Sequence, residues 1–155
     1  MSIAIEVEDD AWLRLPGLEA MTQTAVGAAL EAAGLVEADV YVLFTDDRSI
    51  AEMNAEWRGQ AKATNVLSFP APEDMPLPAG EPRPLGDIVL ASGVVSREAG
   101  EQCKTLHDHA THLISHGALH LLGHDHEDEG QAAAMEQLEI DILKGLGISN
   151  PYERQ

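Results

Sequence analysis

The segment LHDHATHLISHGALHLLGHDH, residues 106–126, carries the pattern that decides how this chain folds and where its chemistry lies. Within it, His116, His120 and His126 follow the spacing H-x-x-x-H-x-x-G-x-x-H. Two histidines four residues apart lie on one face of a helix, one turn apart, so both imidazoles can reach a single ion. Nitrogens bound to zinc lie about 2.0–2.1 Å from the metal, whereas each helical turn adds about 5.4 Å. A third ligand therefore cannot come from the next turn of a straight helix.

Gly123 gives the chain a way to reverse direction between the second and third histidines. Glycine adopts the left-handed conformation that closes a helix C-terminus without a penalty from a Cβ atom. We therefore expect a helix over about residues 106–122 that ends at Gly123 and lets His126 return as a third ligand. Three protein ligands leave a fourth position for water, which is typical of a catalytic zinc site.

The chain has seven histidines, all within residues 107–126, so other combinations have to be weighed. The triple His112, His116 and His120 fails, because its two ends lie two helical turns apart. For His109, His112 and His124 we expect solvated helix or loop positions, some of them beside a metal ligand.

The same helix has an apolar stripe that should hold it against a core while its imidazoles face a cleft. The stripe consists of Leu106, Ala110, Leu113, Gly117 and Leu121.

Outside this helix, the apolar pattern predicts four strands and four further helices. Strands are expected at residues 3–8, 40–44, 66–69 and 87–91. Helices are expected at residues 18–33, 48–57, 94–103 and 129–146, the second of them capped by Thr45 or Asp46. The proline-rich segment 71–84 is expected to be a loop beside a cleft. The sequence thus predicts an α+β (α/β-like) fold, with a mixed sheet of about four strands, about five helices and a metal site at the end of a central helix.

Composition predicts one domain over residues 1–155, since 155 residues with 45% apolar side chains suffice for a hydrophobic core. The acidic N-terminus lacks the basic region of a signal peptide. No apolar run approaches the roughly 20 residues that cross a bilayer. Cys103 is the only cysteine, so no internal disulfide can form. We expect a cytoplasmic protein with no membrane association.

The formal net charge of −18 should repel nucleic acid unless the few cations are concentrated on one face. Residues 125–141 contain seven acids and no lysine or arginine, which predicts a solvated helix face. The central third of the chain holds five of the nine basic residues, which permits a positive cleft: Arg58, Lys62, Arg83, Arg97 and Lys104.

Several polar residues are further candidates for a site. Arg58 is suited to phosphate, because a guanidinium makes paired hydrogen bonds and stays charged. Asn65 and Ser68 would hydrogen-bond a substrate or cap a turn. Asp87 would accept a hydrogen bond from a metal-bound histidine, or shape a turn. Asp125 would act as a base, orient a ligand or shape the turn between its two histidine neighbours.

Together these features resemble the YbeY family of bacterial endoribonucleases, also called rRNA maturation factors. The resemblance rests on residues 116–126, on Arg58, on the run TNVLSFP at 64–70 and on LGDI at 85–88. It implies a single α/β domain with one Zn²⁺ per chain, bound by His116, His120 and His126. It also implies a cleft in which Arg58 meets RNA phosphate, so that Arg58, His116 and His120 carry the catalysis.

The resemblance further implies a zinc-dependent endoribonuclease specific for single strands, acting in small-subunit rRNA maturation and ribosome quality control. Its expected partners are ribosomal RNA and the small ribosomal subunit, with ribosomal proteins or an Era-type GTPase as further partners. In the family the residue before Asp125 is often tyrosine. Here it is His124, which places an additional imidazole near the expected metal.

Two other classes of function remain open. The histidine spacing also resembles metzincin metallopeptidases, H-E-x-x-H-x-x-G-x-x-H, in which the glutamate is the general base. Here that position is Gly117, so a peptidase would need its base elsewhere. The third class is a non-catalytic ribosome assembly factor that contains zinc, against which the open coordination position counts.

Overall fold

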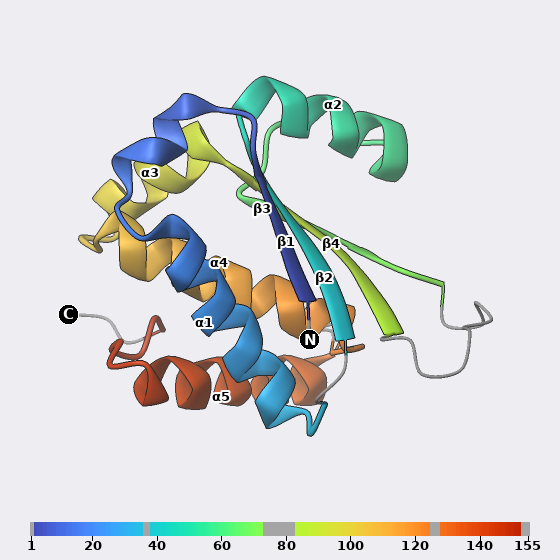
Figure 1. Ribbon diagram of the computed structural model, residues 1–155, viewed down its shortest axis with the longest axis vertical. Helices are drawn as coiled ribbons and strands as arrows, with labels where there is room; N and C mark the ends of the chain where they lie inside the picture. The colour runs from blue at the N-terminus through green and yellow to red at the C-terminus, as the bar shows by residue number, and fades with distance from the viewer. Residues whose placement is uncertain (1, 36–37, 73–82, 125–127, 153–155) are drawn as a thin grey trace.

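The computed structural model describes residues 2–35, 38–72, 83–124 and 128–152. They form a four-stranded sheet with five α-helices and a short 3-10 helix, which confirms the predicted α+β class (Figure 1). The strands are β1 (Ser2–Val7), β2 (Ala38–Thr45), β3 (Val66–Pro70) and β4 (Arg83–Ala91). The helices are η1 (Asp10–Arg14), α1 (Leu18–Ala32), α2 (Asp47–Arg58), α3 (Ser92–Glu101), α4 (Leu106–Leu121) and α5 (Glu129–Gly145).

The sheet is mixed, in the order β1-β2-β4-β3. β1, β2 and β4 run parallel, whereas β3 is antiparallel to β4 at the edge. β4 begins earlier than predicted, and its register with β2 shifts so that Leu85 is an extra residue between the Pro84 and Gly86 pairings. Gly86 has φ +135°, and a Cβ there would lie 2.2 Å from the carbonyl oxygen of Phe69. Only glycine fits this irregularity between two close strands.

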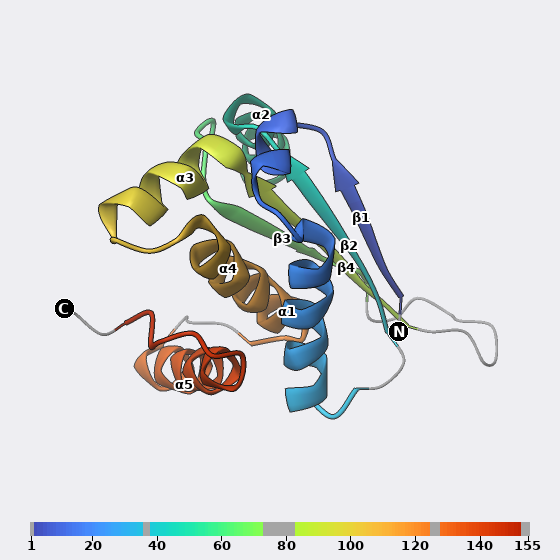
Figure 2. The same cartoon turned by 60° about the vertical axis from the view of Figure 1, so that its left-hand side comes forward.

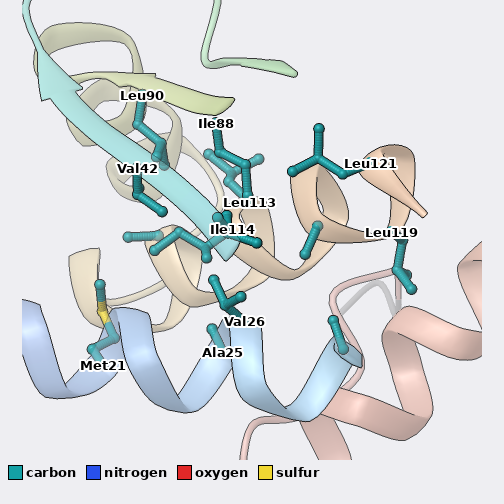
Figure 3. Packing of buried hydrophobic residues seen from close by; sticks show 14 of the residues in the cluster. Met21, Ala25, Val26, Val42, Ile88, Leu90, Leu113, Ile114, Leu119 and Leu121 are labelled. Atoms are coloured by element: carbon teal, nitrogen blue, oxygen red, sulfur yellow. The ribbon is translucent and has the colours of Figure 1, made fainter. Parts of the chain in front are cut away.

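The two faces of the sheet are covered by different helices (Figures 1 and 2). α1 and α4 pack on one face, with α5 behind them, and form the larger core with Val42, Ile88 and Leu90 of the central strands (Figure 3). α2 covers part of the other face, where Ile50 packs with Leu43, Leu67, Val89 and Ala91. The central strands are thus apolar on both sides, as expected for parallel strands between helices.

Side-chain caps explain where several helices begin. The Asp46 carboxylate accepts the N–H of Ser49 at the start of α2, as predicted, and Thr105 does the same for Asp108 at the start of α4. The 3-10 helix η1 was not predicted, because five residues are too few for a helical period. It buries Trp12, whose Nε1–H donates to the carbonyl of Thr45. In the ranges that the structure describes, no helix is long and apolar enough to cross a membrane.

Candidate metal centre

The helix α4 brings His116 and His120 together at one end of the large core. Their Nε2 atoms lie 3.1 Å apart, and both side chains are half-buried. The predicted apolar stripe beside the histidines on α4 is confirmed. Leu113 and Leu121 are buried in the core (Figure 3), and so is Ala110. The core therefore fixes the rotation of α4, and this rotation points both imidazoles the same way.

α4 ends as predicted at Gly123, which has φ +97°. The N–H of Gly123 donates to the carbonyl of His120, and the N–H of His124 donates to that of Leu119, both at 3.0 Å. These two bonds form a Schellman motif, which satisfies the last carbonyls of the helix and turns the chain back. His126 and Asp125 lie outside the described residues, so their roles stay predictions. Within the described residues, no group of three potential metal-binding side chains is present.

A residue that the sequence did not single out supports the histidine pair. Glu139 of α5 is only 1% exposed, and its Oε1 accepts a hydrogen bond from Nδ1 of His116. The same oxygen lies 3.5 Å from Nε2 of His112, and the hydroxyl of Tyr152 donates to the other oxygen, Oε2. The prediction of a solvated acidic face over residues 125–141 is wrong at this position. Glu139 falls on the buried stripe of α5 with Met135, Ile142 and Leu143, a spacing that would have revealed it.

The environment of Glu139 keeps it ionised. Burial raises the pKa of this carboxyl, but hydrogen bonds from His112, His116 and Tyr152 outweigh burial and lower its pKa to about 2. An anionic carboxylate at Nδ1 fixes the tautomer of His116 with its proton on Nδ1. Nε2 is then the ring nitrogen that faces His120.

The histidine pair fits the zinc ion that the sequence motif implies. Two nitrogens that share a tetrahedral zinc at about 2.0–2.1 Å lie about 3.3–3.4 Å apart, close to the 3.1 Å between the two Nε2 atoms. Zinc-bound histidines also usually donate their other N–H to a carboxylate, as His116 does to Glu139.

The two histidines line a cavity of about 520 Å³, named here the histidine cleft. Among the described residues, its lining contains an arginine and three histidines but no carboxylate, so the cleft differs from the acidic bulk of the chain. The structure thus brings six of the predicted site residues to one place. The lining residues are Arg58, Asn65, Val66, Leu67, Ser68, Pro70, His116, His120, Gly123 and His124.

Arg58 is the last residue of α2 and lines the cleft together with the histidines of α4. Its Nη2 donates to the carbonyl of Ser68 at 2.7 Å, and its guanidinium carbon lies 5.8 Å from the centre of the Phe69 ring. This anchoring uses one of the five N–H donors of the guanidinium. The head group is therefore held at the edge of the cleft as a cation.

Asn65 and Ser68 line the cleft but make bonds within the protein. The Asn65 amide donates to Glu98 at 3.1 Å and accepts the N–H of Val66 at 2.7 Å, which agrees with the turn alternative. The Ser68 hydroxyl donates to the carbonyl of Gly117 at 3.3 Å and so joins β3 to α4.

Glu98 also accepts from Nε2 of His109, which is 2% exposed. The expectation that His109 is solvated is therefore wrong.

Asp87 does not reach the histidines. Side chains alternate along a strand, and its neighbour Ile88 faces α4, so Asp87 points to the other face of the sheet, beside Tyr41 and Phe69. There it is exposed and lines a second pocket. The carboxylate bound to a histidine belongs to Glu139 instead.

Gly117, where a metzincin has its glutamate, is buried against the sheet. A Cβ at this position would lie 2.9 Å from Cγ2 of Ile88 and 3.2 Å from the Ser68 hydroxyl. The position therefore has no room for a catalytic side chain.

Comparison with known proteins gives consistent results. Residues 4–147 match a family model described as endoribonuclease YbeY. An endoribonuclease YbeY of Chelativorans sp. strain BNC1 is 52% identical over 89% of this chain and 83% of its own length. That of Agrobacterium fabrum is 47% identical over 100% of this chain and 96% of its own length. The solution structure of TM1509 from Thermotoga maritima shares the fold, with a TM-score of 0.55 at 23% identity, and the match covers 98% of this chain and 99% of that one.

Proposed function

The chain belongs to the endoribonuclease YbeY family, and from this premise we propose that it is a zinc-dependent endoribonuclease that cleaves single-stranded RNA. One observation supports the proposal above the others. The pair of His116 and His120, backed by the buried carboxylate of Glu139, lies in the same cleft as Arg58. The candidate metal ligands and a cation suited to phosphate thus line one cavity.

In this proposal His116, His120 and His126 hold the zinc ion. When bound, zinc supplies Lewis acidity, which polarises a phosphate oxygen or lowers the pKa of a water molecule. Glu139 keeps the His116 ring in place and its proton on Nδ1. Arg58 binds the phosphodiester with the N–H donors not used by Ser68, and it stabilises the negative charge that develops in the transition state.

The walls of the cleft suit a flexible anionic chain. Among the described lining residues no carboxylate opposes a phosphate, whereas the rest of the surface of a chain with net charge −18 repels RNA. RNA binding should therefore be confined to the cleft and should weaken as salt rises. The absence of room at Gly117 argues against peptide hydrolysis by a metzincin mechanism.

The proposal extends to the cellular role implied by the family. The substrate is ribosomal RNA of the small subunit, and the enzyme acts in its maturation and in ribosome quality control in the cytoplasm. The small ribosomal subunit, ribosomal proteins or an Era-type GTPase would bring an acidic enzyme to its RNA.

The test combines metal analysis with parallel cleavage assays. We expect the purified wild-type protein to contain one zinc per chain and to cleave single-stranded RNA, with no cleavage of duplex RNA or of a peptide library. His120→Ala should lose both zinc and RNA cleavage. A His120→Ala protein that lost zinc but cleaved RNA at the wild-type rate would refute the metal mechanism. Zinc without any RNA cleavage would favour a non-catalytic assembly factor, and peptide cleavage would favour a metallopeptidase.

A further inference from the structure

A second cavity of about 880 Å³ lies on the α2 face of the sheet, next to the histidine cleft. We call it the aromatic pocket, and its lining includes Tyr41, Met53, Glu56, Trp57, Phe69 and Asp87. The two cavities share Arg58, Ser68 and Pro70 in their walls. A strand of RNA in the cleft can therefore continue into the aromatic pocket past Arg58.

The aromatic residues of the chain are concentrated here. The whole sequence has two tryptophans, two tyrosines and two phenylalanines, and one of each lines this pocket. Trp12 is buried in the core, but Trp57 on α2 is 68% exposed. Phe69 is half-buried on β3, with the Arg58 guanidinium 5.8 Å from its ring centre. An exposed indole beside a phosphate-binding arginine has no role in the packing of the core.

The charged residues that line the two cavities differ, so each cavity should bind a different part of a nucleotide. Glu56 and Asp87 line the aromatic pocket, and Arg58 is its only cation among the described lining residues. Carboxylates repel phosphate but accept hydrogen bonds from the amino groups of bases. The hydroxyl of Tyr41 donates its proton to Glu6, so that proton is not available to a ligand. The pocket therefore favours a base over a phosphate.

We propose that the aromatic pocket is a base-binding subsite for RNA. A phosphate held by Arg58 places the adjoining unpaired base against Trp57 and Phe69, where it stacks, and an amino group on its edge donates to Asp87 or Glu56. Base stacking on aromatic side chains is the usual way in which proteins bind single-stranded RNA. A base that uses both its face and its edge in this way cannot be paired, so the subsite selects single strands. The inference rests on the proposed endoribonuclease function and specifies how its substrate is chosen.

The test uses the zinc-loaded enzyme and a set of short RNAs in which each nucleotide in turn lacks its base. We expect that removing one base next to the scissile phosphate lowers kcat/KM about 10-fold or more. Trp57→Ala should lower kcat/KM on the intact RNA by a similar factor and should cause no further loss on that abasic RNA. Phe69→Leu, which keeps an apolar side chain but removes the aromatic face, should behave in the same way.

A second arm tests the edge of the base. Asp87→Asn should reduce the preference for a base with an amino group over uracil at that position, without changing cleavage of the abasic RNA. Leu13→Ala is the matched control, because Leu13 is 65% exposed and lines neither cavity.

The outcomes separate this inference from the function on which it rests. If Trp57→Ala cleaves intact and abasic RNA with the same kcat/KM values as the Leu13→Ala control, the subsite is refuted. A protein partner would then be the better explanation for the exposed aromatic surface. The proposed function survives that result, since the wild type still cleaves RNA. If the zinc-loaded wild type cleaves no RNA at all, the proposed function fails and the subsite fails with it.

Discussion

The carboxylate of Glu139 on α5 accepts the Nδ1 proton of His116 on α4, and this bond connects α5 to the histidine pair of the candidate metal centre. Tyr152, beyond the end of α5, donates to the other oxygen of the same carboxylate. The imidazole that faces the cleft is therefore oriented by residues 23 and 36 positions later in the sequence. Both α5 and the chain that follows it belong to the site.

Replacing Glu139 with glutamine should weaken zinc binding while leaving the fold in place. Glutamine has nearly the same shape, but it is neutral, so it neither fixes the Nδ1 tautomer of His116 nor raises the basicity of Nε2. Loss of such a supporting carboxylate typically costs 10–100-fold in metal affinity, which a titration against a competing chelator measures. Glu136→Gln is the matched control, since Glu136 is exposed one turn earlier on α5. Equal affinities in the two variants would contradict the role of Glu139.

Charge reversal at Arg58 should abolish RNA cleavage without changing the zinc content. The guanidinium lies at the edge of the cleft, and loss of one transition-state donor typically costs about 10²–10³ in kcat. Arg58→Glu adds repulsion of phosphate and should lose at least that much, and Arg58→Lys should recover only part of the activity, because lysine lacks the planar fork. Arg48→Glu is the control for net charge, since Arg48 lies on the same helix and pairs only at the surface with Glu52. Zinc analysis beside cleavage rates would show whether Arg58 acts on RNA or on the metal site.

Local rules were enough to predict the part of the site that lies on α4. The spacing of His116 and His120 and the reversal at Gly123 depend only on the geometry of one helix and its C-terminus. Their convergence could therefore be read from the sequence. The same holds for the strands and helices with a clear period, whereas the short helix η1 has none.

The partners of these residues could not be predicted, because they depend on packing between elements. The strand DIVLA, residues 87–91, is apolar on both faces. Its sequence pattern therefore does not tell whether Asp87 lies on the face of the sheet that α4 covers. The extra residue at Leu85 also reverses the alternation of β4, so the residues that precede it point to the opposite faces of the sheet from those that an unbroken strand would predict. Likewise, the burial of His109 arises from α3, which places Glu98 against it.

Gly117→Ala should destabilise the protein although alanine favours helices. The added methyl would lie 2.9 Å from Cγ2 of Ile88, inside van der Waals contact, so the strand or the helix has to move. Overpacking of this kind costs about 1–3 kcal/mol, which urea denaturation measures. In contrast, Gly100→Ala on α3 should be neutral or stabilising, because no atom outside the neighbouring backbone of α3 lies within 4 Å of its added Cβ. A Gly117→Ala variant as stable as Gly100→Ala would show that α4 does not pack this tightly on β4.

The free energy of unfolding should fall as the pH drops below about 6.5, and part of this fall should depend on His109. Burial lowers the pKa of His109 below its ordinary value, and the nearby charges of Lys104 and His112 act in the same direction, while Glu98 opposes them. Nδ1 of His109 has no hydrogen-bond partner among the described residues, so no acceptor there stabilises a second proton on the ring. Because its pKa is lowered in the folded state, His109 takes up its proton at a higher pH in the unfolded chain than in the folded one, which favours unfolding as the pH falls below about 6.5. Chemical denaturation at several pH values between 5.5 and 7.5, with zinc present throughout, should give a smaller slope for His109→Gln than for the wild type. The zinc ligands titrate in both proteins, so their contribution cancels in the difference between the two. Parallel curves of unfolding free energy against pH would mean that His109 takes up its proton equally in the folded and unfolded states.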